Sequence, residues 1–415
     1  MHILFLTDNF PPEVNAPASR THEHCRQWVR QGHSVTVITC APNFPAGRVY
    51  DGWRNKGWQV GELDGIRVIR VWSYITANEG FVRRVLDYVS YMATATLASL
   101  FVRRVDVVVA TSPQFFTAVA GWLVGGFKRV PWVFELRDLW PESIKAVGAM
   151  KESPTIRLLE RLELFLYRRA ARVVSVTESF RRNLGQRGID TGKIDVITNG
   201  VDISRFSPRP KDAALEASLG LQGCFVAGYV GTHGMAHGLE TLLEAAQRLT
   251  AHPQGRRIRI VLLGDGARKA ALKAQAAQMA LDNVVFIDSV AKDEVARYWS
   301  LLDVSIIHLR RTELFTTVIP SKLFECMGMG IPVLHGVKGE SAEIVEREGV
   351  GIPFEPEDAE QLSQLLLRVS SEPGNLANMR ERCLSAAQRY DRGALAQRML
   401  DSLVRLGPSR ARPGA

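Results

Sequence analysis

The 415-residue sequence has few cysteines, and none of them are paired in a motif. The five are scattered along the chain without a C-x-x-C spacing: Cys25, Cys40, Cys224, Cys326 and Cys383. An odd number of isolated cysteines argues against a disulfide framework or a zinc site. We therefore expect reduced thiols and a cytosolic environment.

Other signals are also absent. No low-complexity tract or short-period repeat occurs, which excludes collagen, coiled coils and solenoids. The N-terminus runs from Met1 and His2 directly into the apolar residues 3–6, without a basic region, a long apolar core or a cleavage site. We expect no secretory signal.

The length and the charge distribution are informative. A chain of 415 residues with 46% hydrophobic residues favours two domains of roughly 200 residues each. Residues 1–205 contain 27 Lys and Arg against 19 Asp and Glu, so they carry +8 of the chain's net +9. A basic first half could face nucleic acid, an anionic membrane or a phosphorylated substrate, and charge alone does not choose among these.

Short apolar runs alternate with helical patterns along both halves of the chain. In the first half the strand candidates are residues 2–7, 34–39, 67–71, 105–110, 132–136, 172–176 and 194–198. In the second half they are residues 225–230, 259–263, 284–287, 304–307 and 332–334. This alternation predicts α/β architecture with two doubly wound, Rossmann-like parallel sheets that enclose a cleft.

The alternation of apolar runs and helical patterns begins again after a Pro-bearing stretch at residues 206–210, and this break sets the expected domain boundaries. We expect an acceptor-facing domain at 1–205 and a donor-binding domain at 206–385. We expect residues 386–415 to form a helix that packs back toward the first domain and ends in a frayed tail.

Residues 81–104 have an apolar middle bracketed by Arg83-Arg84 and Arg103-Arg104. The apolar stretch of about 18 residues is at the lower limit for a bilayer span, and Asp87 interrupts it. Three interpretations remain open: a packed helix of the first domain, a helix that also touches a membrane surface, or a true span.

Loops that follow strands are where doubly wound sheets place ligands. The first such loop, residues 8–17, has no G-x-G-x-x-G, so an NAD-type fingerprint is absent; it is either a stiff turn with a helix cap or a cleft-facing loop. Glycines follow two strands of the second half, at 228–234 and 264–266. Such glycines allow backbone N–H groups to approach a phosphate, although a plain tight turn explains one such cluster equally well.

The segment VIPSKLFECMGMG at 318–330 is the most informative. Ser321 can cap a helix whose N-terminus attracts a phosphate, with Lys322 beside it as a positive charge. Glu325 lies on roughly the same helical face and could accept hydrogen bonds from ribose hydroxyls. The alternative is a solvated pair of Lys322 and Glu325.

Taken together, these motifs resemble the retaining glycosyltransferases of family 4, which have the GT-B fold, over nearly the full chain. The similarity is greatest to the bacterial branch that builds O-antigens and other surface polysaccharides, which includes N-acetyl-L-fucosamine transferases. It rests on residues 10–13 (FPPE), 137–142 (RDLWPE), 199–202 (NGVD), 228–231 (GYVG), 264–266 (GDG) and 320–325 (PSKLFE).

The resemblance implies a nucleotide-sugar donor held mainly by the second domain and an acceptor met mainly by the first. The implied donor contacts are Gly231, Thr232, His233, Gly264, Asp265, Gly266, Val290, Pro320, Ser321, Lys322 and Glu325. The implied acceptor-side residues are Glu13 and Asn15, and Arg137 and Asp138 would reach the transferred sugar as catalytic residues.

Three departures from the family pattern limit this transfer of roles. The first Glu of the family's E-x7-E element is Thr317 here, and Glu313 does not restore the spacing. Many members carry Arg and Lys after the second domain's first strand, whereas here His233 and His237 stand nearby, which shifts diphosphate neutralisation toward Lys322 and toward Arg310 or Arg311. The family's frequent His-Asp is Arg137-Asp138, so no catalytic His is assigned.

The sequence contains no D-x-D element, and His22 and His24 are expected to be surface or cleft-lining residues, so we expect neither a metal ion nor another cofactor. The resulting hypothesis is a metal-independent, retaining transferase that moves a sugar, such as an N-acetylated deoxyhexosamine, from a UDP-sugar to a lipid-linked or lipopolysaccharide saccharide. It would act in the cytoplasm, peripherally on the inner face of the membrane, and would not bind nucleic acid.

Two rival hypotheses remain: a GT-B sugar-nucleotide epimerase, and a non-catalytic nucleotide-sugar-binding subunit of a polysaccharide assembly complex.

Overall fold

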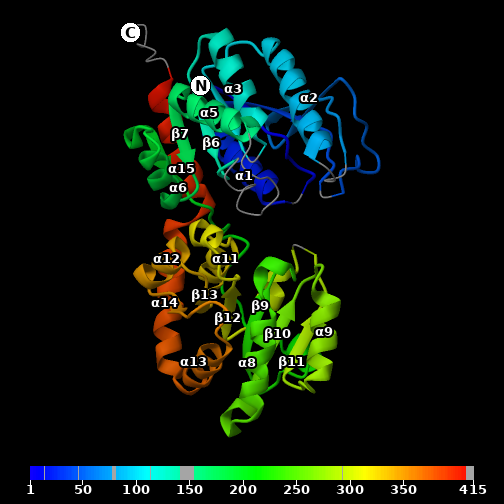
Figure 1. Ribbon diagram of the computed structural model, residues 1–415, viewed down its shortest axis with the longest axis vertical. Helices are drawn as coiled ribbons and strands as arrows, with labels where there is room; N and C mark the ends of the chain where they lie inside the picture. The colour runs from blue at the N-terminus through cyan, green and yellow to red at the C-terminus, as the bar shows by residue number, and fades with distance from the viewer. Residues whose placement is uncertain are drawn as a thin grey trace. The chain divides into compact units, whose positions relative to one another are not determined.

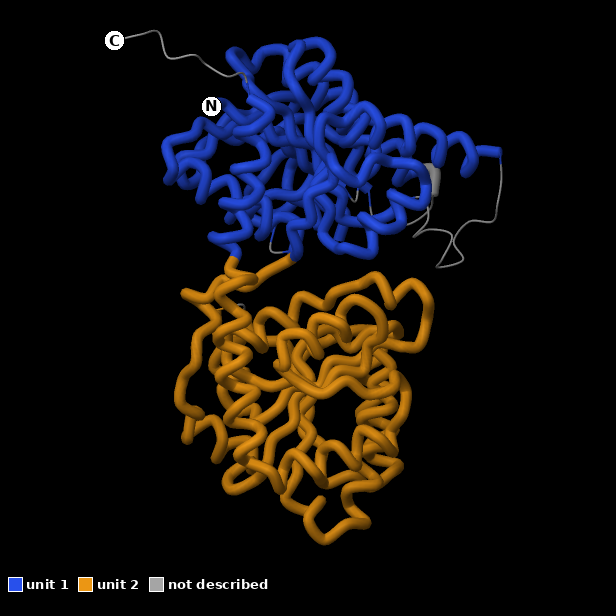
Figure 2. The backbone as a smooth tube through the Cα atoms, turned by 90° about the vertical axis from the view of Figure 1, so that its left-hand side faces the viewer, with its two compact units in different colours: residues 1–198, 392–415 blue, residues 199–391 orange. Residues whose placement is uncertain are grey.

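The computed structural model describes residues 1–13, 15–44, 46–76, 81–112, 114–140, 154–291 and 293–407. The chain forms two compact units, coloured separately in Figure 2. Unit 1 is Met1–Thr198 with Arg392–Ala415, and unit 2 is Asn199–Asp391.

The boundaries differ by a few residues from the expected positions at 205 and 386. Unit 2 begins earlier because the N–H of Val201 donates to the carbonyl of Tyr390 (2.9 Å), and Val201 forms a parallel bridge with Asp391. The last helix begins at Arg392, because residues 386–389 complete the helix before it.

Unit 1 contains one sheet in the order β3-β4-β2-β1-β5-β6-β7-β8. Its strands are β1 (His2–Leu6), β2 (Ser34–Cys40), β3 (Trp58–Leu63), β4 (Ile66–Val71), β5 (Val107–Thr111), β6 (Trp132–Leu136), β7 (Arg172–Ser175) and β8 (Ile194–Val196). The described strands pair in parallel except β3, which runs antiparallel to β4. Our sequence analysis missed β3 because it is an edge strand, largely exposed and without an apolar run.

Helices cover both faces of this sheet (Figure 1). They are α1 (Ala16–Arg30), α2 (Phe81–Leu100), α3 (Phe115–Lys128), α5 (Pro154–Arg169), α6 (Glu178–Gln186) and α15 (Arg392–Leu406), with a 3-10 turn η1 (Thr191–Lys193). One face carries α1 and α15, joined by a hydrogen bond from Trp28 Nε1 to the Ala396 carbonyl (2.9 Å). The other face carries α2, α3 and α5 over a core that includes Tyr91 and Phe134.

Of the segment 81–104, residues Phe81–Leu100 therefore form a helix that packs on the sheet, as the packed-helix interpretation predicted. Within the described ranges, no helix is both long and apolar enough to cross a bilayer.

Unit 2 contains a parallel sheet in the order β11-β10-β9-β12-β13-β14. Its strands are β9 (Phe225–Val230), β10 (Ile258–Leu263), β11 (Val284–Ile287), β12 (Val304–His308), β13 (Val333–Gly336) and β14 (Gly351–Pro353). The first five confirm the strand predictions. The three-residue β14 was missed because it is too short to give a pattern.

The helices of unit 2 also lie on both faces of its sheet (Figure 1). They are α7 (Ala213–Ser218), α8 (Glu240–Thr250), α9 (Lys269–Gln278), α10 (Val295–Trp299), α11 (Lys322–Met329), α12 (Glu340–Glu348), α13 (Ala359–Ser371) and α14 (Pro373–Arg389). Three 3-10 turns lie between them: η2 (Met235–His237), η3 (Pro253–Arg257) and η4 (Glu313–Thr317). The core formed with α8 and α13 and the core formed with α11 and α14 lie on opposite faces, so the loops after β9 and β10 remain at the sheet edge.

Candidate functional site

Two glycine loops meet at the carboxyl edge of the unit 2 sheet. Gly231 follows β9 with φ +143°, and Gly264 follows β10 with φ +141°. A Cβ at Gly264 would lie only 1.9 Å from the carbonyl oxygen of Gly231. The loops can therefore pack this closely only because residue 264 is glycine.

The loops use several of their own amides to hold this arrangement. The N–H of Gly231 donates to the Leu263 carbonyl (2.9 Å), and the N–H of His233 donates to the Asp265 carbonyl (2.8 Å). The Gly231 amide is therefore engaged within the protein, and the approach of Gly231 and Thr232 to a diphosphate stays a prediction. Among the described residues, the amides of Thr232 and Gly234 have no protein acceptor, so their hydrogen-bonding capacity is not used within the protein.

Lys322 is the central charge of this site. Its Nζ lies 3.7 Å from the centre of the Tyr229 ring, is buried, and has no hydrogen-bond partner among the described residues. A Cβ at Gly231 would come within 2.8 Å of Nζ, so glycine at this position makes room for the ammonium group. Burial lowers the pKa of Lys322 to about 8. A buried ammonium group without an anionic partner is costly, and a bound anion would stabilise it.

Two histidines adjoin Lys322. The ring of His233 is completely buried (0% exposed), and both ring nitrogens lack a partner among the described residues. His233 was predicted to contact the donor. In this conformation its ring is not at the loop surface, and only its backbone could make such a contact. His237 is partly exposed, and its ring packs edge-on against Tyr229 at 5.8 Å. Burial, followed by the charge of Lys322, lowers the pKa of His237 to about 4.

The helix α11 positions the remaining donor-site candidates of the PSKLFE motif. The prediction that Ser321 caps this helix is wrong, because its backbone is already helical (φ −59°, ψ −28°) and its side chain makes no cap hydrogen bond. Its carbonyl instead accepts from the N–H of Phe324 (3.1 Å). Glu325 lies one turn further along and is half-buried, on the partly open side of a helix whose other residues are mostly buried. Pro320 and Val290 are also half-buried near this edge.

The other charged side chains predicted for the donor site already have polar partners within unit 2. Asp265 Oδ1 accepts from the Gly266 amide (2.7 Å). Arg310 donates to the Met235 carbonyl (2.7 Å) and pairs with Glu240 (3.4 Å). Arg311 pairs with Glu355 (3.3 Å). Because both arginines have carboxylate partners, the expectation that they neutralise a diphosphate gains no support, and Lys322 remains the candidate.

Thr317 lies on η4, at the position where the family's E-x7-E element has its first Glu. Thr317 Oγ1 donates to the Leu314 carbonyl (3.0 Å), and Glu313 at the start of the turn is exposed. The carbonyl oxygen of Thr316 packs against Gly339, where a Cβ would lie 2.0 Å away. At position 317 the turn therefore carries a hydroxyl group that is used within the turn, where the family pattern has a carboxylate.

In unit 1, Arg137 and Asp138 follow β6 and are half-buried, next to the ion pair of Arg20 and Glu135 (3.4 Å). Burial, followed by the charge of Arg20, lowers the pKa of Arg137 to about 9. The arrangement brings a cluster of charge to the end of the central strands. The rest of the RDLWPE motif, residues 141 and 142, lies outside the described residues.

The loop after β1 is anchored by Glu13, which was predicted to face the acceptor. The side chain is buried, and Oε1 accepts from the amides of Asn43 (2.8 Å) and Phe44 (3.0 Å). Asn15 caps α1 by accepting from the Ala18 amide (2.8 Å). The loop therefore contains a helix cap, in which Glu13 has a supporting role, and a cleft-facing role of the loop stays a prediction.

Asn15 also lines a cavity of about 230 Å³ at the ends of β1, β2 and β5. Its other walls include Asp8, Arg84, Asp87 and Tyr88. Burial raises the pKa of Asp87 to about 6, and Asp87 Oδ1 accepts from Ser73 Oγ (2.5 Å). Sequence reasoning missed the α2 residues because their spacing of three and four was interpreted only as part of an apolar helix.

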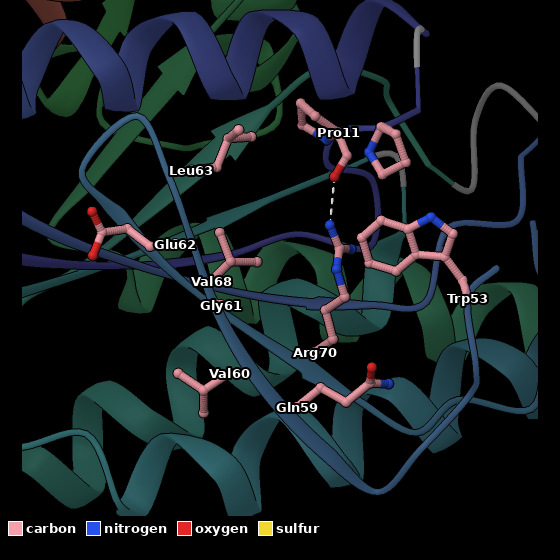
Figure 3. A pocket seen from close by; sticks show the side chains of 10 residues that line it. Pro11, Trp53, Gln59, Val60, Gly61, Glu62, Leu63, Val68 and Arg70 are labelled. Carbon is pink, nitrogen blue, oxygen red and sulfur yellow. Dashed lines mark hydrogen bonds between the residues drawn. The ribbon is translucent and has the colours of Figure 1, made fainter.

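A second hollow, of about 380 Å³, lies beside β3 and β4 (Figure 3). Arg70 stacks under the Trp53 ring at 4.6 Å and donates to the carbonyl of Pro11. Gly61 leaves open space on this wall, since a Cβ there would meet no atom within 4 Å. Arg70 therefore fixes the proline-rich loop from the sheet side.

Across the part of the chain that is described, no group of three or more His, Cys, Asp and Glu side chains is arranged to hold a metal ion. His22 pairs with Asp64 (2.9 Å), and His24 is buried against Trp28, so His24 is neither a surface nor a cleft-lining residue. Metal independence remains a prediction.

The sequence matches two described domain families. Residues 15–200 match "Glycosyl transferase 4-like domain", and residues 224–372 match "Glycosyl transferases group 1". WcaI of Escherichia coli strain K12, named for colanic acid biosynthesis, is 25% identical over 87% of this chain and 90% of its own length. A GDP-mannose-dependent alpha-mannosyltransferase of Mycobacterium tuberculosis is 24% identical over 94% of this chain and 91% of its own.

Solved structures share the fold along nearly the whole chain. HepE of Anabaena in complex with UDP gives a TM-score of 0.72 at 18% identity, covering 98% of this chain and 100% of that one. WaaG, a glycosyltransferase involved in lipopolysaccharide biosynthesis, gives 0.66 at 15% identity, covering 97% and 99%. The fold is therefore GT-B.

Proposed function

The chain carries the two domains of a GT-B glycosyltransferase, and we propose that it transfers a sugar from a UDP-sugar to a saccharide of a cell-surface polysaccharide. The carrying observation is the buried ammonium group of Lys322, which lies beside Gly231 and has no hydrogen-bond partner among the described residues. The diphosphate of a nucleotide sugar is an anion that suits this position. The UDP complex of HepE and the naming of WcaI for colanic acid biosynthesis support the donor class and the pathway.

In the proposed reaction the anomeric configuration is retained and no metal is used. The bond from the anomeric carbon to the diphosphate oxygen breaks, and the oxygen of the acceptor hydroxyl forms a bond to the same carbon. Lys322 and the loop amides stabilise the growing charge on the leaving diphosphate. A donor phosphate oxygen takes the proton of the acceptor hydroxyl on the same face, so no side-chain base is required. Glu325 holds the ribose hydroxyls, and Asp138 contacts the transferred sugar.

We propose that the acceptor is carried by a lipid and is met at the membrane surface. Leu86, Leu97 and Leu100 of α2 are exposed, as is Phe101 directly after the helix, and we call these four side chains the apolar face of α2. Arg83, Arg103 and Arg104 are exposed at its ends, which suits an anionic bilayer. Arg84 is different, because it donates to Tyr88 Oη (3.1 Å) and lines the unit 1 cavity.

Product analysis tests the proposal against its two rivals. The purified chain is incubated with UDP-sugars, with and without an extracted lipid fraction, and the products are corrected for hydrolysis. Transfer of sugar only when lipid is present is the expected result. An epimerase would convert the UDP-sugar without lipid, and a non-catalytic subunit would bind the donor without turnover.

A further inference from the structure

The loop between β9 and α8 brings a second nitrogen-bearing side chain, that of His237, next to Lys322. The His237 Nδ1 is buried and has no hydrogen-bond partner among the described residues. The ring of His237 and the ammonium of Lys322 both pack on Tyr229, at 5.8 Å and 3.7 Å from its centre. Two potential cations therefore converge on one aromatic ring at the edge of the sheet.

The backbone fixes the position of His237. Its carbonyl accepts from His308 Nδ1 (2.7 Å), and its N–H donates to the Gly234 carbonyl (3.1 Å). Gly238 follows in the left-handed region (φ +52°), which turns the chain into α8. The imidazole is thus held at the loop in which the amides of Thr232 and Gly234 have no acceptor among the described residues.

We infer that His237 is a second ligand of the donor diphosphate and takes up a proton from solvent when a nucleotide sugar binds. This inference rests on the proposed function and adds to it a role for a histidine that adjoins Lys322. In the free protein, His237 is neutral at pH 7 because burial and Lys322 lower its pKa to about 4. A bound diphosphate reverses the sign of the local field and favours the charged imidazolium.

The other titratable and charged groups around His237 do not take over its proposed uptake of a proton. They are Tyr229 on β9, His233 in the same loop, Glu240 at the start of α8, His308 and Arg310 at the end of β12, and Lys322 on α11. Glu240 is paired with Arg268 (2.6 Å) and Arg310 (3.4 Å), so its charge is compensated. His308 Nε2 accepts from the Glu357 amide (2.9 Å) and its Nδ1 donates to His237, so both its nitrogens are engaged.

The sign of the pH dependence follows from linkage. The free pKa of His237 is about 4 and the bound value is higher, so protons are taken up between the two values and affinity rises as pH falls. The slope in that window is at most roughly tenfold per pH unit for one proton. Lys322 behaves separately, because its free pKa of about 8 places its proton uptake at alkaline pH.

Calorimetry of the full chain tests this inference. UDP-glucose, GDP-mannose and dTDP-glucose are screened at pH 7, and whichever binds is titrated at pH 5.5 and pH 9 in buffers of different ionisation enthalpy. Nucleotide sugars are suitable because they lack the phosphate monoester group that ionises near pH 6. The number of protons taken up per bound ligand is the readout.

We expect proton uptake at both pH values in the wild type. His237→Gln should lose the uptake at pH 5.5 and keep the uptake at pH 9, while Lys322→Arg should do the reverse. His237→Lys should bind with an affinity independent of pH between 5.5 and 7.5. The control His252→Gln, at an exposed histidine after α8, should match the wild type.

Binding without proton uptake at pH 5.5, or equal uptake by His237→Gln and wild type, would overturn the inference and leave the proposed function standing. Circular dichroism confirms that each variant is folded. Failure of all three nucleotide sugars to bind the folded wild type would overturn the proposed function, and this inference with it.

Discussion

The ammonium group of Lys322 lies over the face of Tyr229, 3.7 Å from the ring centre, and has no anionic partner among the described residues. The ring provides a cation–π contact that offsets part of the cost of burial. A ligand can offset more of this cost, because an anion that binds here would pair with an ammonium group that has no hydrogen-bond partner among the described residues. A site that is unfavourable when empty is therefore well suited to bind a diphosphate.

The first prediction concerns nucleotide affinity. Lys322→Ala and Glu325→Ala should each weaken UDP binding by about 1–3 kcal/mol, the range for losing a hydrogen bond to a charged group. Isothermal titration calorimetry measures this, with Lys273→Ala, at a solvent-exposed lysine of α9, as the matched control. Wild-type affinity in both test variants would remove these residues from the donor site.

The second prediction concerns stability and pH. Lys322→Met should raise the thermal unfolding midpoint, because it removes a buried ammonium group while keeping an apolar chain of similar length. The folded pKa of about 8 lies below the ordinary lysine value, so the wild type carries the full penalty below pH 8. The difference between the variant and the wild type should therefore shrink as pH rises above 8. A lower midpoint for the variant at pH 7 would show that the ammonium group stabilises the free protein.

The third prediction concerns turnover. Asp138→Asn should lower kcat at least tenfold while UDP affinity stays nearly unchanged, because Asp138 belongs to unit 1 and the nucleotide loops belong to unit 2. Steady-state kinetics and calorimetry on the same preparation separate the two effects. Full activity in this variant would contradict the assigned contact with the transferred sugar.

The fourth prediction concerns metal. Transfer should continue in the presence of EDTA, because Lys322 and the loop amides would supply the charge stabilisation that a divalent ion gives in other transferases. The assay compares rates before and after chelation, and after magnesium or manganese is added back. Complete loss of activity that either ion restores would refute the proposed diphosphate site.

The fifth prediction concerns the membrane. The chain should bind anionic liposomes at low ionic strength and be largely released by salt, since each Lys or Arg near such a surface contributes about 1 kcal/mol. Leu97 and Phe101 are 61% and 73% exposed on the apolar face of α2, and Trp58 packs edge-on against Phe101 at 5.9 Å. Leu97→Ser with Phe101→Ser, and separately Arg83→Ser with Arg103→Ser, should weaken sedimentation with liposomes.

Leu158 on α5 is 65% exposed, so Leu158→Ser is a matched control that should bind like the wild type. Arg84 is left intact because it also lines the unit 1 cavity. Equal binding to neutral and anionic liposomes, or no binding to either, would mean that α2 is only a packed helix.

Local sequence determined the strands with buried apolar runs and the loops that carry the donor-site residues. Strands β9, β10 and β11 follow from apolar runs that end in Gly or Asp, and this pattern is visible without a structure. The neighbourhood of Gly231 and Gly264 could also be predicted, because adjacent parallel strands end at the same sheet edge. The edge strand β3 could not be predicted, since its exposed residues carry no period.

Tertiary structure decided how these residues are used. The sequence by itself determined that Lys322 stands at the start of a helix, but only the fold places its Nζ on Tyr229, far away in the chain, and leaves it unpartnered. Likewise, the spacing of α2 indicated one apolar helix, whereas packing on the sheet divides it into a face toward the Asp87 cavity and an exposed face with Phe101. The physical reason is that burial and hydrogen-bond partners depend on contacts between distant segments, which no local pattern records.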